Sequence, residues 1–258
     1  MRVLAYATMQ LKARLAYRED LVLRGLGELL VTAAGLVVVL TIYHHVPTVR
    51  GWSVHEVLLC WGIAEAGLGL FWTVFRGLHL LNRQYILGGE LDRVMLRPMD
   101  PLVQVLLDHL APESLAKVVL GLAVVAQGAW GLGLPWGPLQ WVLLPVMVLS
   151  ATAIVGGFLT GLSAVGFWMQ HQGSAIGLAY QVTVFSRYPV DLYPRLVGLA
   201  LLTVLPFAFA GFVPATLYMD RPDWLPLALA TPLVGAVCLG AGWGFWRFSL
   251  KRYASSGH

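Results

Sequence analysis

Long apolar stretches, separated by short polar segments, constrain the possible folds of this sequence more than any other feature. A run of about 20 apolar residues crosses the hydrocarbon core of a bilayer as a helix, and the chain has several such runs. Only 12% of its 258 residues are charged, which is about half the share found in soluble domains. No segment between the apolar runs is long enough to bury a core of its own. We therefore expect one all-α integral membrane domain that covers residues 1–258.

Hydropathy places five of the expected transmembrane helices. They cover Leu26–Tyr43, Val57–Phe75, Val118–Leu134, Leu139–Trp168 and Leu225–Trp246. A sixth lies between residues 170 and 219, at one of two positions. Hydropathy favours Leu196–Met219, where Pro206 and Pro214 would kink the helix. In the alternative the helix covers about Gln170–Tyr188, and residues 196–219 form a proline-broken re-entrant element on the outer side.

The distribution of Lys and Arg orients the six expected helices, because short loops rich in these residues stay in the cytoplasm. If the N-terminus is inside, thirteen of the 17 basic residues are cytoplasmic, and only Arg50 and Arg221 lie clearly outside. Both termini are then cytoplasmic (N-in/C-in). Residues 1–25 combine apolar residues at helical spacing with basic ones, which predicts an amphipathic helix in the cytoplasmic interface. The net charge of +4 follows from this topology, so we expect no nucleic-acid partner.

One polar segment interrupts the apolar pattern more than the others: Tyr85–Pro101, which reads YILGGELDRVMLRPMDP. Gly88 and Gly89 break the preceding structure, and the charged residues that follow are spaced around a short helix. Pro98 and Pro101 end that helix, because proline lacks the donor N–H and restricts the residue before it. We interpret this charged helix between two membrane spans as a surface that a soluble partner contacts.

Two stretches resemble the ABC-2-type permeases, the membrane subunits of a class of ABC exporters. GELDRVMLRPMDP (Gly89–Pro101) is similar to their cytoplasmic loop, and RYPVDLYPRLVGLALLTVLPFAFAGFVPATL (Arg187–Leu217) is similar to the segment before their last span. The resemblance covers nearly the whole chain and is strongest to six-span bacterial permeases that are often encoded beside a second permease and an ATPase. It favours the alternative fifth span, because the corresponding YP element usually precedes an outer re-entrant hairpin.

The resemblance implies a multi-pass subunit of the bacterial plasma membrane with no ATPase of its own. The sequence agrees, because it contains no G-x-x-x-x-G-K-[ST] loop to cradle the phosphates of a nucleotide. ATP and Mg²⁺ would bind to a partner ATPase subunit, and a second permease copy, identical or a sister permease, would complete the substrate path. In the family the loop between spans two and three, here residues 76–117, carries a coupling helix that docks into the ATPase. The matching residues are Glu90, Leu91, Asp92, Arg93, Arg97 and Asp100. The family's pre-span helix also contacts the ATPase and corresponds to Lys12, Arg14, Arg18 and Glu19.

Glu65 lies in the middle of the second expected span, where a carboxylate is costly and therefore a candidate functional group. It could line the substrate path or bind a cation or proton. The simpler interpretation is a neutral or hydrogen-bonded carboxyl that faces the bundle interior. An ion-coupled secondary transporter or channel that uses Glu65 is the second hypothesis, although the sequence offers no polar relay and no clear internal repeats. A membrane scaffold without transport is a third.

Two G-x-x-x-G pairs allow close packing of helices in lipid: Gly157 with Gly161, and Gly240 with Gly244. We expect them to pack helices within the bundle, and a seam between two copies is the alternative. The sequence shows no metal-binding pattern, and its two cysteines, Cys60 and Cys238, both lie in apolar stretches. We expect no metal site and no enzymatic activity in this chain.

Overall fold

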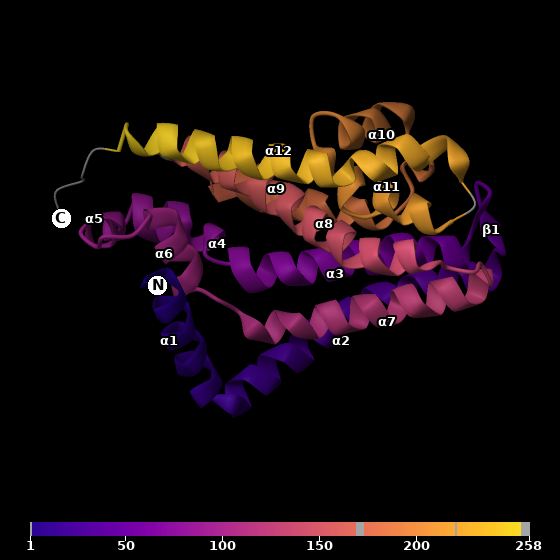
Figure 1. Ribbon diagram of the computed structural model, residues 1–258, viewed down its shortest axis with the longest axis horizontal. Helices are drawn as coiled ribbons and strands as arrows, with labels where there is room; N and C mark the ends of the chain where they lie inside the picture. The colour runs from indigo at the N-terminus through magenta and orange to yellow at the C-terminus, as the bar shows by residue number, and fades with distance from the viewer. Residues whose placement is uncertain (1, 169–172, 220, 254–258) are drawn as a thin grey trace.

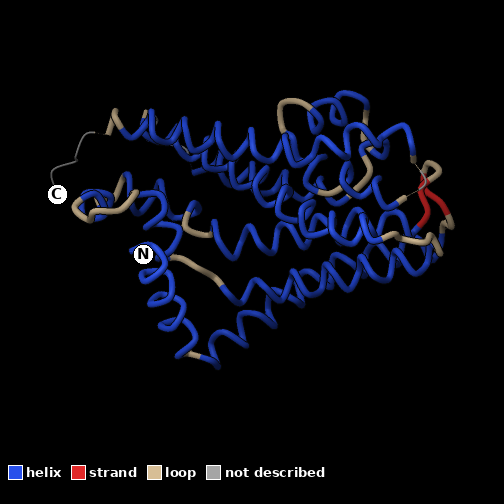
Figure 2. Tube along the Cα trace, viewed as in Figure 1, coloured by secondary structure: helices blue, strands red, loops and turns tan. Residues whose placement is uncertain are grey.

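The computed structural model describes residues 2–168, 173–219 and 221–253, which form an elongated helical bundle (Figures 1 and 2). The long helices are α2 (Arg18–His45), α3 (Val54–Phe75), α7 (Leu115–Leu132), α8 (Pro138–Ala164) and α12 (Leu225–Leu250). The shorter helices are α1 (Arg2–Ala16), α4 (Leu78–Leu80), the π-helix η1 (Leu81–Ile86), α5 (Glu90–Met95), α6 (Pro101–Asp108), η2 (Pro112–Ser114), η3 (Val165–Phe167), α9 (Gly173–Val182), η4 (Thr183–Arg187), η5 (Val190–Leu192), α10 (Arg195–Leu202), η6 (Pro206–Ala210), α11 (Phe212–Ala215), η7 (Thr216–Tyr218) and η8 (Pro222–Trp224).

Five helical segments in the described part of the chain are long and apolar enough to cross a membrane. They cover Arg18–His45, Val54–Phe75, Pro112–Leu132, Pro138–Phe167 and Pro222–Leu250. Each corresponds to one stretch that hydropathy predicted, and the largest shift is at α2, which begins eight residues before Leu26. Of the alternative fifth span, Gln170–Gln172 lie outside the described residues, and α9 and η4 form a helical segment from Gly173 to Arg187.

The sequence predicted one amphipathic helix over residues 1–25, but the structure has two helices in this segment. Helix α1 ends at Ala16, and the backbone of Tyr17 leaves the helical region with φ −100° and ψ 67°. Helix α2 then begins at Arg18 and continues without a break to His45. Figure 1 shows α1 and α2 meeting at a sharp angle. The turn therefore separates a short helix from the first membrane-spanning helix, and Arg18 belongs to the latter.

Helix α3 is the centre of the bundle. Every residue from Val57 to Gly69 is buried, because α7 and α8 pack against α3 and α12 packs on the far side of α8. The closest approach to α7 depends on small residues, since a Cβ at Gly62 would lie 2.7 Å from the carbonyl oxygen of Gly121. Small residues at such crossings let helix backbones approach closely in lipid.

A tight β-hairpin joins α2 to α3. Strands β1 (Thr48–Val49) and β2 (Trp52–Ser53) pair antiparallel. The two turn residues, Arg50 and Gly51, have φ values of 51° and 80°, as a type I′ turn requires. Ser53 then begins α3 with a capping box, in which its hydroxyl accepts from the backbone N–H of Glu56 and the Glu56 carboxylate accepts from the backbone N–H of Ser53.

Residues Leu196–Met219 do not form the continuous helix that hydropathy favoured. They are divided among α10, η6, α11 and η7, and η6 begins at Pro206. Proline there cannot donate a helical hydrogen bond, and Gly211 interrupts the backbone again with φ −155°. Phe207 through Thr216 are nevertheless all buried. Hydropathy detected this burial but could not distinguish a compact, broken element from a span.

Candidate functional site

The segment between α3 and α7 is a folded unit rather than an open loop. Gly89 has φ 73° and turns the chain into α5, and this left-handed conformation suits glycine. Leu91 and Val94 point from α5 into the interior and are buried. The buried side-chain amide of Gln104 on α6 donates to the carbonyl oxygens of Val94 at 3.2 Å and Met99 at 2.8 Å. These contacts hold α5 and α6 together as one rigid hairpin.

Several of the predicted coupling residues have structural roles in this hairpin. The carboxylate of Glu90 accepts from the Gln84 amide at 2.7 Å. Asp100 caps α6 by accepting from the backbone N–H groups of Leu102 and Val103, and it also lies 3.4 Å from Arg247 of α12. Pro101 therefore begins a second helix instead of ending the segment, which corrects the sequence-based interpretation.

The surface of the hairpin that remains exposed is partly apolar. Leu96, just after α5, has 86% of its surface exposed, and its neighbour Met95 and Leu87, which precedes α5, are exposed as well. Arg93 and Arg97 are exposed as well. We call Leu87, Arg93, Met95, Leu96 and Arg97 the coupling surface. The two arginines were among the residues expected from the sequence, but the three apolar residues were not, because a sequence does not show which apolar side chains the fold leaves exposed.

Helix α1 packs on this hairpin through a hydrogen-bond network around Asp108. The carboxylate of Asp108 accepts from the hydroxyl of Tyr6 and, at 2.7 Å, from the amide of Gln10. Arg14 donates to the backbone oxygen of Asp108 at 3.1 Å, and Arg97 donates to the Tyr6 hydroxyl at 2.8 Å. Of the predicted interfacial residues, only Arg14 takes part in this network; all four are exposed, namely Lys12, Arg14, Arg18 and Glu19.

Burial shifts the pKa values of Tyr85 and His109, which lie next to this network. The hydroxyl of Tyr85 lies 2.9 Å from Nε2 of His109. Burial, with smaller contributions from the nearby carboxylates of Asp108 and Glu90, raises the pKa of Tyr85 to about 12. Burial also lowers the pKa of His109, against the opposing effect of the Asp108 carboxylate. The neutral imidazole is therefore favoured at this position.

A second polar cluster joins three helices at the same end of the bundle. Arg76, just after α3, lies 2.7 Å from Glu28 of α2 and also contacts the carboxylate of Glu113 in η2. Lys117 of α7 lies 3.8 Å from the second oxygen of Glu28. The sequence analysis gave no role to Glu28 or Glu113, because their partners are distant in the sequence.

Glu65 has a charged partner that no pattern in the sequence indicated. Nη2 of Arg187, in η4, lies 2.7 Å from Oε2 of Glu65. The hydroxyl of Thr32 on α2 donates to Oε1 at 3.3 Å. The Arg187 guanidinium also lies over the ring of Trp61, 5.7 Å from its centroid. The Glu65 carboxylate is fully buried, and its charge is compensated by a residue from a different element.

One of the two glycine pairs lies at a close helix crossing. A Cβ at Gly157 of α8 would collide with the backbone of Cys238 on α12, and Gly161 is in ordinary contact with Gly242. Gly240 and Gly244, in contrast, have open space where a Cβ would be. The α12 residue at this crossing is Gly242, because Gly240 and Gly244 lie on another face of the helix. Gly240 and Gly244 therefore do not pack α12 against another helix in the described part of this bundle, contrary to the prediction from the sequence.

The described residues contain no cluster of three or more His, Cys, Asp or Glu side chains that could hold a metal ion.

Comparison with known proteins identifies the family. The sequence profile described as "ABC-2 family transporter protein" matches residues 29–257. No curated protein and no solved structure matches the chain. The family match covers almost the whole chain and agrees with its apolar spanning helices, which together support a multi-pass membrane protein with a role in transport. This chain belongs to the ABC-2 family of transporters.

Proposed function

We propose that the chain is the permease subunit of an ATP-driven exporter and that a separate ATPase subunit docks on the coupling surface. The family supports a transport role, and the sequence has no phosphate-binding loop of its own. ATP and Mg²⁺ would bind to the ATPase subunit. This chain would then supply the surface on which the ATPase docks and the path that the substrate takes.

The observation that carries this proposal is the exposure of Leu96. An apolar side chain on a polar hairpin gains about 25 cal/mol for each square ångström that a partner covers. Leu96 is 86% exposed, whereas Leu91 and Val94 on the same helix are buried. The helix is thus anchored on one side and presents Leu96, Arg93 and their neighbours on the other, as a docking surface requires.

Two contacts would transmit movement of the hairpin to α1 and to the membrane-spanning helix α12. Arg97 and Asp108 connect it to α1 through the hydroxyl of Tyr6. Asp100 connects it to α12 through Arg247, at 3.4 Å. When ATP brings two ATPase subunits together, displacement of α5 and α6 would therefore reach both ends of the chain. Packed elements move as units in such transitions.

We propose the N-in/C-in topology with six spans for this bundle. The first turn of α1, the last turn of α12 and α5 lie at one end, and β1, α10 and α11 lie at the other (Figure 1). The helical segment from Gly173 to Arg187 would serve as the fifth span, and residues 196–219 as a re-entrant element on the outer side. A second copy, identical or a sister permease, would complete the path in the bacterial plasma membrane.

The second hypothesis, an ion-coupled carrier or channel, would require Glu65 to bind and release a cation. Arg187 already neutralises the Glu65 carboxylate at 2.7 Å, and Thr32 donates to its other oxygen. A carboxylate with a resident cationic partner has little affinity for a second cation. We therefore favour a structural role for this pair.

Affinity purification from native membranes tests the proposal. The tagged chain should co-purify with an ATP-hydrolysing subunit, and Leu96→Glu should release it because the substitution introduces a charge into the covered surface. Leu96→Glu suits this test better than a charge reversal at the predicted coupling residue Glu90, since the Glu90 carboxylate already accepts a hydrogen bond from Gln84 of η1. Val46→Glu is the matched control, because Val46 is also an exposed apolar residue but follows α2 at the opposite end. Purification without an ATPase would contradict the proposal, as would equal loss in both variants.

A further inference from the structure

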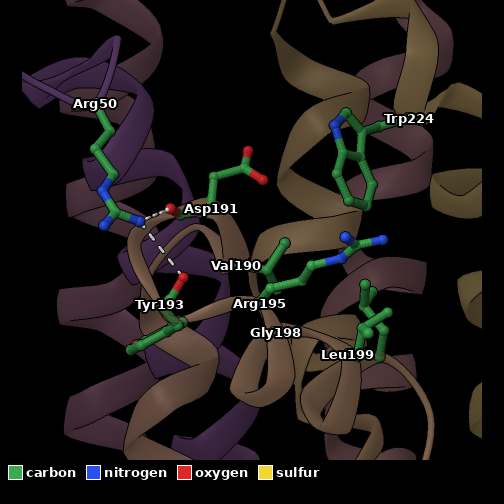
Figure 3. A pocket seen from close by; sticks show the side chains of 9 residues that line it. Arg50, Val190, Asp191, Tyr193, Arg195, Gly198, Leu199 and Trp224 are labelled. Atoms are coloured by element: carbon green, nitrogen blue, oxygen red, sulfur yellow. Dashed lines mark hydrogen bonds between the residues drawn. The ribbon is translucent and has the colours of Figure 1, made fainter.

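A pocket of about 360 Å³ (Figure 3) lies beside α10, at the end of the bundle opposite α5 (Figure 1). Its walls come from η5, α10 and the residue that ends η8. The residues that line it are Arg50, Val190, Asp191, Tyr193, Arg195, Gly198, Leu199, Leu202 and Trp224. Its volume falls within the range of small-molecule sites, which runs from about 300 to 1,000 Å³.

Arg50, in the turn of the β1–β2 hairpin, holds the loop that bears Asp191 in place. Nη1 of Arg50 donates to the backbone oxygen of Asp191 at 2.7 Å and approaches that of Tyr193 at 3.5 Å. The Tyr193 hydroxyl donates to the backbone oxygen of Phe185 at 3.2 Å. Pro189 and Pro194 flank η5 and restrict its backbone further. Arg50 thus fixes the loop through backbone groups and leaves the Asp191 carboxylate available.

Two opposite charges face this pocket without partners. Across residues 2–168, 173–219 and 221–253, neither the Asp191 carboxylate nor the Arg195 guanidinium has an ion-pair or hydrogen-bond partner. Figure 3 shows both groups on the side of the pocket that faces Trp224. A guanidinium binds phosphate well, and a carboxylate binds a primary ammonium. An indole face also attracts cations. The pocket therefore suits a ligand that carries an anion and a cation together.

The remaining wall is apolar and continues onto the surface of α10. Val190, Leu199 and Leu202 line the pocket, and Leu196 on the same helix is 81% exposed. An exposed apolar helix beside charged groups and a tryptophan is typical of the boundary between head groups and acyl chains. The ligand should thus have an apolar part that extends along α10.

We propose that this pocket binds the head group of a zwitterionic phospholipid with a primary ammonium, as in phosphatidylethanolamine. Arg195 holds the phosphate, Asp191 and Trp224 hold the ammonium, and the acyl chains lie along Leu199 and Leu202. The assignment does not depend on the proposed ATPase coupling. It depends only on the pocket and on the membrane location of the chain.

Native mass spectrometry of the purified chain with defined lipids tests the assignment. Wild-type protein should retain phosphatidylethanolamine more tightly than phosphatidylglycerol, whose head group has no cation to meet Asp191. Asp191→Asn should weaken phosphatidylethanolamine binding about tenfold, as expected for the loss of one charge-assisted hydrogen bond, and should not weaken phosphatidylglycerol. Arg195→Gln should weaken both lipids. Asp191→Glu, which keeps the charge, should retain the preference for the zwitterionic lipid.

The controls are Asp223→Asn and Arg252→Gln, two exposed charges that do not line the pocket. Equal effects of Asp191→Asn and Asp223→Asn would overturn the assignment, as would a wild-type preference for phosphatidylglycerol. Soluble glycerophosphoethanolamine should displace the lipid poorly, because it lacks the acyl chains. Full displacement by this compound would show that the pocket recognises a water-soluble molecule and not a lipid.

Discussion

Nη2 of Arg187 lies 2.7 Å from Oε2 of Glu65, so a residue at the end of η4 neutralises the carboxylate buried in the central helix α3. Thr32 of α2 completes the contact. Arg187 retains 18% of its side-chain surface exposed, whereas Glu65 retains 1%. The pair therefore joins three segments of the bundle and fixes the position from which the chain enters η5.

Glu65→Gln should destabilise the protein. The substitution keeps the size of the side chain but leaves the Arg187 guanidinium without its counter-ion in a low-dielectric environment, which costs about 3 kcal/mol of unfolding free energy. The double variant Glu65→Gln/Arg187→Gln should recover most of this loss, since it removes both charges. Denaturant unfolding in detergent measures the difference. Equal stability of the single and double variants would show that the two charges are not coupled.

Gly157→Ala should destabilise the crossing of α8 and α12. The added methyl group would collide with the backbone of Cys238 and separate the helices, at a cost of about 1–3 kcal/mol. Gly240→Ala is the matched control on α12, because a Cβ there meets open space; this variant should be as stable as wild type or slightly more stable. Thermal unfolding of the two variants checks the prediction, and similar melting temperatures would contradict it.

The segment from Tyr85 to His109 should lose stability in weak acid. Burial lowers the folded-state pKa of His109 below its ordinary value of 6.5. As the pH falls through 6.5, the unfolded chain therefore takes up the proton first, and stability decreases until the folded-state pKa is passed. Thermal unfolding at pH 7.5 and pH 5.5 should show this decrease, and His109→Gln should reduce it. A wild-type protein that is more stable at pH 5.5 than at pH 7.5 would contradict the prediction.

The sequence predicted the long helices well, because about 20 consecutive apolar residues define a span regardless of its neighbours. Hydropathy alone was wrong at Leu196–Met219, where composition is equally apolar but Pro206 and Gly211 break the backbone into short pieces. Hydropathy measures how apolar a segment is and not whether its hydrogen bonds are continuous. The resemblance to the permease family, which favoured a broken element here, carried information that hydropathy lacked.

The candidate site was predicted less completely, because its contacts join residues that are distant in the sequence. Arg187 is the partner of Glu65, and no local pattern connects them. Gly242, and not Gly240, lies at the crossing of α12 with α8, since a G-x-x-x-G spacing does not say which face of a helix meets its neighbour. The exposure of Leu96 depends on the fold of the whole hairpin. The location of the proposed coupling segment, between charged and punctuating residues, followed from the sequence, as did the inclusion of Arg93 and Arg97.

Site-specific photo-crosslinking in native membranes tests the central claim most directly. A photoreactive amino acid at position 96 should form a covalent adduct with an ATP-binding subunit, whereas the same residue at position 46 should not. Both positions hold exposed apolar residues in the native chain, so reactivity alone would not separate them. An adduct with an ATPase from position 96 only is the predicted result. The absence of such an adduct, in membranes where the chain still drives transport along an ion gradient, would contradict the account.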